Sequence, residues 1–294
     1  MGSFTGFYMH MFPEDVSLSI MPIGGHSSRP NFEVTLCPAD KRVEGIIRAG
    51  LADDYHGSSL ADTLYELFRL VAADLCAAEH AIFEIVYLEE PDTEKVVGFE
   101  LAFISEAQVV EKKGQLYQFV PPELARERNV PELIPLARED LIVFKAPAGF
   151  EKALRDVRLS LSQLDKLQYP ALMLEATERN VPYDFKVHER SMHLALLEAV
   201  KPIGWNARGS FNDCVLSYYW IHLSLTFEKF KIQLREAMLT TLNSGLQHIG
   251  AKIGFNAQIR IDGLPTLADV DAANQNLDSG AMPFTEVMKP FELR

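Results

Sequence analysis

Residues 59–90, SLADTLYELFRLVAADLCAAEHAIFEIVYLEE, contain the junction between a helix and a strand that decides the fold. Ser59 followed by Asp62 has the spacing of a capping box, in which two side chains satisfy backbone N–H groups at the start of a helix. Apolar residues then recur at helical spacing: Leu60, Leu64, Leu67, Phe68, Val71 and Leu75. This spacing predicts a helix that ends near Glu79. The apolar and β-branched run at residues 81–88 predicts a strand directly after it.

A small antiparallel sheet is expected to follow the helix. The other strands that we predict for it lie at residues 96–104, 108–111, 115–120 and 140–145. Lys112, Lys113 and Gly114 separate two of these strands in the manner of a tight hairpin. The proline-bearing stretch at residues 121–135 is predicted to be a loop.

The second half of the chain is predicted to be mostly helical. Its first helix shows apolar residues that step alternately by four and three, the period of a helix that packs lengthwise on another: Phe150, Leu154, Val157, Leu161 and Leu164. Pro170 is expected to interrupt this helix before it resumes for a turn or two to Glu178. Further helices are predicted at residues 187–200, 212–249 and 266–280, with a strand at 257–261. On the long helix, Lys229, Lys231 and Arg235 are predicted to form the solvated face.

These elements predict an α+β fold in four consecutive regions. Residues 1–57 form an irregular N-terminal segment of loops, with one or two short strands and a helix near residues 43–51. Residues 58–147 form the helix and the antiparallel sheet. Residues 148–210 form a helical region, and residues 211–294 contain the long helix and the C-terminal helices.

The composition excludes several classes of protein. Of the 294 residues, 48% are hydrophobic, which is too many for a disordered chain. The formal net charge of −13 argues against a protein whose whole surface grips nucleic acid or an anionic membrane, because both need an excess of cations. The three cysteines, Cys37, Cys76 and Cys214, form no C-x-x-C pair and are expected to be reduced, buried thiols.

The sequence shows no membrane or export signal. The first residues lack the basic and apolar regions of a signal peptide. The most apolar run, Cys214–Phe227, is interrupted by polar residues and is too short to cross a bilayer. We therefore expect a soluble, intracellular protein without a membrane partner.

Catalytic motifs are missing from the sequence. It has no G-x-x-x-x-G-K-[ST] P-loop, no G-x-G-x-x-G after a strand and no G-x-S-x-G nucleophile elbow. His188 and His193 lie five residues apart, whereas two metal ligands on one helix face need a spacing of four. We predict no catalytic residue, no metal site and no cofactor.

Two alternatives stay open at this point. The chain could be an intracellular α+β enzyme whose site residues come from loops such as residues 24–28 or 205–213. It could also be a cytosolic adaptor that binds a partner through Tyr218, Tyr219 and Trp220. Trp205 is singled out as an interfacial aromatic, and its alternative role is that of a core anchor beneath a loop.

Taken in order, the segments resemble the core of tailed-bacteriophage portal proteins. The capped helix leads into AIFEIVYLEE, then into KKGQLYQF after a tight turn, and then into REDLIVFKAPAG before a long helix. In the second half, a helix with Ser191, Met192 and His193 precedes a loop with Gly204-Trp205 and RGSF, followed by the aromatic-rich long helix. The LDSGAMPFTEV stretch at residues 277–287 is similar to the end of the portal core. The resemblance covers residues 59–294.

The resemblance implies a structural protein without enzymatic activity. Portal proteins form a ring, usually of twelve copies, at one vertex of a phage head, and double-stranded DNA passes through it. The implied partners are the terminase large subunit, the major capsid protein and a head–tail adaptor. The implied location is the virion, after assembly in the host cytoplasm. Residues 58–147 would then be wing-like, and residues 148–210 would be stem- or clip-like.

The resemblance also suggests site residues. Charged positions on the helix after residue 150 are the candidates for facing DNA: Lys152, Arg155, Arg158 and Lys166. The candidates for protein interfaces are Trp205, Tyr218, Tyr219 and Trp220. The net charge of −13 is compatible with this function, because an acidic wall that repels phosphates lets DNA slide.

Overall fold

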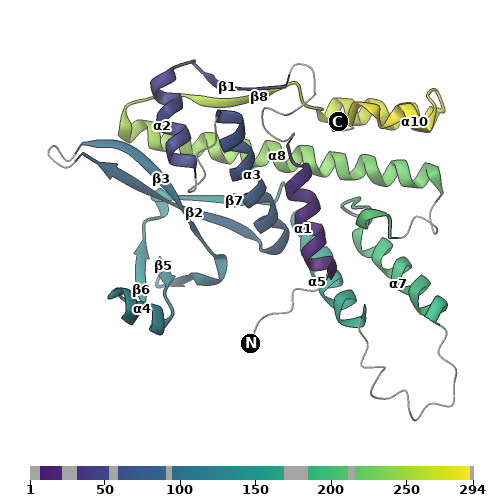
Figure 1. Ribbon diagram of the computed structural model, residues 1–294, viewed down its shortest axis with the longest axis horizontal. Helices are drawn as coiled ribbons and strands as arrows, with labels where there is room; N and C mark the ends of the chain where they lie inside the picture. The colour runs from purple at the N-terminus through teal and green to yellow at the C-terminus, as the bar shows by residue number, and fades with distance from the viewer. Residues whose placement is uncertain are drawn as a thin grey trace, which may run out of the picture. The chain divides into compact units, whose positions relative to one another are not determined.

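The computed structural model describes residues 7–21, 32–52, 59–90, 95–168, 185–210 and 216–291 (Figure 1). The chain folds into two compact units. The helical unit comprises residues 1–20, 147–234 and 265–294, and the sheet unit comprises residues 21–146 and 235–264. The α+β prediction is confirmed, because the described residues contain both long helices and antiparallel sheets.

The strands of the sheet unit form three antiparallel sheets among the described residues. The first has β2 (His80–Glu89) between β3 (Val96–Ile104) and β7 (Leu141–Lys145). The second contains β4 (Val109–Lys112), β5 (Gln115–Phe119) and β6 (Leu133–Leu136), and the third pairs β1 (Glu33–Cys37) with β8 (Gln258–Asp262). The five strands that we predicted for one small sheet are present. That prediction is wrong in one respect, because the strands are divided between the first and the second sheet.

Helix α3 (Leu60–Ala77) begins as its sequence predicts. The Ser59 hydroxyl accepts a hydrogen bond from the backbone N–H of Asp62 and donates one to the Asp62 carboxylate at 2.7 Å. The apolar residues of the predicted stripe are buried, with Leu64, Phe68 and Val71 fully inaccessible. This burial attaches α3 to the sheets and supplies much of the core of the sheet unit.

Helix α2 (Lys41–Leu51) is capped by the Asp40 carboxylate, which accepts the N–H groups of Arg42 and Val43. Near its end, Gly50 lies directly against the ring of Phe99 on β3. A Cβ at this position would come within 2.5 Å of that ring, so the close approach of helix and strand requires glycine.

The helical unit contains several helices. They are α1 (Phe7–Ser19), α5 (Glu151–Gln168), α7 (Phe185–Val200), α9 (Leu267–Ser279), α10 (Phe284–Val287) and the first part of α8 (Ser217–Ile253), with the 3₁₀ turns η4 (Ala207–Gly209) and η6 (Lys289–Phe291). Helix α8 is about 55 Å long at the standard rise per residue. Its residues up to Leu234 belong to the helical unit, and those from Arg235 belong to the sheet unit.

Two faces of α8 carry different parts of the helical unit. Ile221, Leu225 and Ile232 share one face and are buried in a cluster with residues of α9, α10 and η6. Phe230 lies about half a turn away from that face and contacts Phe150, with ring centroids 5.1 Å apart. The C-terminal helices and the start of α5 therefore cover opposite faces of α8.

The N-terminal region is more regular than predicted. Instead of an irregular segment, residues 7–19 form α1, which buries Tyr8, Met11, Phe12 and Val16. In the first turn of α1, the N–H groups of Tyr8 and Met9 donate to the carboxylate of Asp165 on α5, 2.8 and 2.9 Å away. A cap that comes from 156 positions further along the chain leaves no local sequence pattern.

A second helix was predicted as loop. Helix α4 (Pro122–Arg128) occupies part of residues 121–135, with Pro122 at its first turn and Asn129 in the left-handed conformation at its end. Proline favours the first turn of a helix, where its missing N–H has no partner to lose. Two 3₁₀ turns, η2 (Glu106–Gln108) and η3 (Arg138–Asp140), precede β4 and β7.

Some predictions fall outside the described residues. These are the continuation of α5 past Pro170 to Glu178, the start of the long helix at residues 212–215, and the side chain of Cys214. Of the other cysteines, Cys76 is buried as predicted, whereas Cys37 is exposed.

Candidate functional site

The predicted DNA-facing residues lie on α5. The apolar residues Leu154, Val157, Leu161 and Leu164 are buried on one face. The opposite face forms what we call the α5 stripe, an exposed row of five side chains: Lys152, Arg155, Leu159, Gln163 and Lys166. The stripe carries three cations over about 21 Å.

One predicted DNA-facing residue lies apart from the stripe. Arg158 is half-buried on the flank of α5, about a quarter of a turn from the centre of the stripe. The structure therefore brings Lys152, Arg155 and Lys166 to one exposed face, and Arg158 beside it.

Of the predicted interface residues, those at the start of α8 are partly exposed. Tyr218 is 44% exposed, while Tyr219 and Trp220 are half-buried. The Tyr218 hydroxyl donates to the Asp278 carboxylate at 2.8 Å, and this hydrogen bond raises the pKa of the phenol. Its ring lies 6.3 Å from that of Phe284. These two exposed rings form what we call the Tyr218 patch; Leu216 and Met282, each two residues before one of the rings, are also exposed.

Trp205 is a core anchor beneath its loop, not an interfacial aromatic. Its side chain is completely buried. The indole N–H donates to the Asp15 carboxylate of α1 at 2.9 Å, and the ring lies 5.2 Å from that of Phe12. The prediction of an interfacial Trp205 is therefore wrong, because α1, the helix missed by sequence reasoning, covers it.

Arg208 completes this connection between the loop and α1. Its guanidinium donates to Asp15 at 2.6 Å and to Glu14 at 2.7 Å. The hydrogen bond from Arg208 lowers the pKa of Glu14. The loop at residues 201–210 is thus fixed to α1 by one buried aromatic side chain and one arginine.

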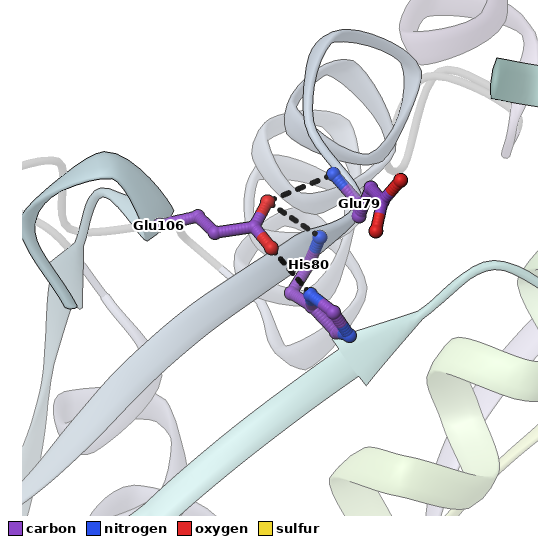
Figure 2. Close-up of side chains that lie close together, drawn as sticks. All are labelled: Glu79, His80 and Glu106. Atoms are coloured by element: carbon purple, nitrogen blue, oxygen red, sulfur yellow. Dashed lines mark hydrogen bonds and ion pairs between the residues drawn. The ribbon is translucent and has the colours of Figure 1, made fainter. Parts of the chain in front are cut away.

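A cluster that sequence reasoning missed lies at the start of β2 (Figure 2). Glu79, His80 and Glu106 place potential metal-ligand atoms within 4.8 Å of one another, and they are the group of this kind found among the described residues. One oxygen of Glu106 accepts the backbone N–H groups of Glu79 and His80, at 2.9 and 3.2 Å. The other lies 2.5 Å from Nδ1 of His80. Both carboxylate oxygens of Glu106 are therefore already hydrogen-bonded within the fold.

This cluster is a structural connection. Glu106 belongs to η2, the turn that leads from β3 to β4, so its hydrogen bonds fix where the second sheet leaves the first. Burial alone would raise the pKa of Glu106, but the hydrogen bonds from the His80 ring and from the two backbone N–H groups lower it. Asp74 on α3 has a raised pKa, because it is partly desolvated and lies near the negative charge of Glu106.

A testable consequence is loss of stability in acid. The lowered pKa of Glu106 contributes stability above the unfolded value of 4.5, and this contribution is lost as the pH falls through the folded value. Glu106→Gln should reduce the free energy of unfolding at pH 7 by about 1 kcal/mol. It should also flatten the decline in stability below pH 4.5, measured by urea unfolding at a series of pH values. Glu100→Gln, an exposed carboxyl on β3, is the control. An unchanged pH profile in Glu106→Gln would contradict this role.

A second polar cluster fixes the end of α8 within the sheet unit. Lys252 donates to Asp140 of η3 at 2.7 Å and lies 4.1 Å from the ring centroid of Tyr87. Burial alone would raise the pKa of Asp140, but the hydrogen bonds from Lys252 and His248 lower it. This cluster also has a structural role.

For the enzyme alternative, we expected site residues in the loops at residues 24–28 and 205–213. Among the described residues, these loops do not bring catalytic side chains together. Residues 24–28 and 211–213 lie outside those residues, and Trp205 is buried. His188 and His193 are both half-buried on α7, and their spacing of five separates them around the helix. Within the described part of the chain, no helix combines the length and the apolar composition needed to cross a membrane.

Comparison with known proteins gives matches at the level of structure. No family model and no curated protein matches the sequence. The structure is similar to a chain from the virion of a native gene transfer agent particle, with 13% identity and a TM-score of 0.50, over 99% of this chain and 91% of that chain. It also resembles a chain from the neck of a native gene transfer agent particle computed with C12 symmetry (12% identity, TM-score 0.47, 98% and 89% covered). A third is an HK97-family phage portal protein from Corynebacterium diphtheriae (8% identity, TM-score 0.43, 88% and 96% covered).

The match to the virion chain defines the fold. It extends over nearly the whole length of both chains, so it concerns the full arrangement of elements. The chain therefore has the fold of a chain from this gene transfer agent virion.

Proposed function

We propose that this chain is the subunit of an oligomeric portal ring at one vertex of a phage-type head, through which double-stranded DNA is packaged and ejected. The observation that carries the proposal is the full-length structural match to a virion chain. The order of sequence segments, from the capped helix to LDSGAMPFTEV, also supports it, because that order resembles the portal core.

The ring would contain about twelve copies, as the resemblance implies. A cyclic ring joins two different surfaces of each copy, so each subunit offers one surface to each neighbour. The Tyr218 patch, with Tyr219 and Trp220 beside it, is our candidate for one of these surfaces. Aromatic side chains exposed together on a folded unit are typical of protein interfaces.

The α5 stripe is our candidate for the DNA-facing surface. Three cations on one exposed helix face can contact phosphates. The chain as a whole carries a formal charge of −13, so these contacts would be few and weak in total. Such a surface guides DNA without holding it.

The remaining partners follow from the same proposal. The ring would dock the terminase large subunit during packaging, the major capsid protein at the vertex and a head–tail adaptor afterwards. Its own role would be structural and non-enzymatic, and ATP hydrolysis would belong to the motor. It would assemble in the host cytoplasm and remain in the virion.

The mass of the purified protein tests the proposal. Native mass spectrometry should find a closed assembly of about twelve chains over a wide range of concentration. A stable monomer or dimer over that range would contradict the ring. A metal or cofactor that copurifies with a monomer would favour the enzyme alternative.

A further inference from the structure

A small cavity lies along one side of α8 within the helical unit. Its volume is about 280 Å³. Its floor consists of Ser224, Phe227, Glu228 and Lys231, which are spaced as i, i+3, i+4 and i+7 and therefore share one face of the helix. Met288 and Phe291 form one wall, and the loop at residues 204–206 forms the other.

Lys231 makes this cavity unusual. Of the charged residues that the structure describes, Lys231 is the one that is buried, with 6% of its surface exposed. The sequence predicts this lysine on the solvated face of the helix, and the structure shows that prediction to be wrong. A lysine is rarely buried unless it is paired, because removing its charge from water is costly.

The partner of Lys231 is Glu228, one turn earlier on the same helix. The ammonium donates to Oε1 of Glu228 at 2.8 Å, and the carboxylate is also largely buried. The ammonium lies 5.0 Å from the centroid of the Phe227 ring. It has three N–H donors, of which one is used by Glu228. The second carboxylate oxygen of Glu228 is a further acceptor, and no second hydrogen bond to either group is found among the residues that the structure describes, so a donor and an acceptor remain side by side at the cavity.

An amide group complements this pair. Its carbonyl oxygen can accept a hydrogen bond from Lys231, and its N–H can donate one to Glu228. An anion would meet the carboxylate of Glu228, and a cation would meet the ammonium of Lys231. Phe227, Met288 and Phe291 supply apolar contact for the rest of the ligand.

The walls of the cavity are preformed. Gly204 has a φ of +82°, and a Cβ at this position would come within 2.3 Å of the carbonyl oxygen of Leu223. The loop can therefore lie this close to α8 only with glycine at this position. The next residue, Trp205, is buried against α1. A cavity with fixed walls binds without the cost of ordering them.

We propose that this cavity binds an uncharged amide group carried on a compact apolar body. The amide can belong to a free small molecule or to a polypeptide, since the chemistry at Lys231 and Glu228 is the same for both.

Three probes that share one ring test the polar part of the proposal. Benzamide, benzoate and benzylamine should be titrated into the full chain and their binding followed by ligand-observed NMR. Benzamide should bind at least about tenfold more tightly than the other two, because only it matches both members of the pair. Tighter binding of benzoate or benzylamine, or equal binding of all three, would overturn the proposal.

Variants then locate the binding. Lys231→Met should weaken benzamide binding about tenfold or more. The double variant Lys231→Met with Glu228→Gln leaves no unpaired buried charge, so it keeps the test valid if the single variant folds poorly. Lys229→Met is the matched control, because Lys229 is exposed on the same helix, and it should bind benzamide as the parent does. Retained binding in the folded double variant would refute the site.

A blocked amino acid distinguishes the two sources of the amide. N-acetyl-leucine methylamide carries two peptide amides and one apolar side chain. If it binds more tightly than benzamide and also depends on Lys231, the cavity receives a polypeptide segment. If benzamide binds more tightly, the cavity receives a small molecule.

Discussion

Replacing Trp205 by alanine should lower the free energy of unfolding by about 3–5 kcal/mol, the usual cost of deleting a large buried aromatic side chain. Trp205 is completely buried, contacts Phe12 and donates its indole N–H to Asp15. The variant therefore creates a cavity and leaves the Asp15 carboxylate without one donor. Urea unfolding followed by circular dichroism at a fixed protomer concentration measures the effect.

Two further substitutions separate the causes. Trp205→Phe keeps most of the volume and should cost less, about 1–3 kcal/mol, mainly for the lost hydrogen bond. Trp220→Ala removes the other tryptophan, which is half-buried, and should cost less than Trp205→Ala. Equal costs at the two positions would show that Trp205 is not the anchor of this loop.

Reversing the charge of the α5 stripe should block DNA entry while the ring still forms. The triple variant Lys152→Glu, Arg155→Glu and Lys166→Glu places three carboxylates where three cations lie on one exposed face. At contact distance each reversed charge costs about 1 kcal/mol or more near a phosphate, even in water. We expect at least about a tenfold fall in DNA-filled particles from producer cells that carry the variant, with an unchanged mass of the purified assembly.

A triple variant in the sheet unit is the matched control. Lys112→Glu, Lys113→Glu and Arg128→Glu change the net charge by the same amount at exposed positions. This variant should give normal numbers of filled particles. If the α5 variant instead fails to assemble, the stripe is a contact between subunits. If it packages DNA normally, the stripe does not face DNA.

The parts of the fold that depend on neighbouring residues could be predicted. The capping box at Thr266 forms, and that helix ends at Gly280 in the left-handed conformation; at Ser59 the hydroxyl caps α3 by accepting the N–H of Asp62. The hairpin around Lys113 and Gly114 is present, with both residues at positive φ. In each case the signal and the structure that it specifies lie within a few residues of each other.

The parts that depend on distant residues could not be predicted. The helix α1 has its first N–H groups capped by Asp165, and β1 pairs with β8 across more than 200 residues. No local pattern records either contact.

The same reason explains why the roles of particular residues were missed or wrongly predicted. Trp205 is buried because of α1, and Glu106 binds the start of β2 from 26 positions away. The helical pattern predicts an exposed position for Lys231. The residue is buried because η6 and the loop at residues 204–206 pack around α8. The exposed face of α5 was predictable, since its buried and exposed residues alternate with the helical period.

Electron microscopy of the purified chain tests the central claim most directly. We expect end-on views of a closed ring of about twelve subunits with an open central channel wide enough for double-stranded DNA. Particles that are uniformly monomers or dimers, or closed assemblies without a channel, would contradict it.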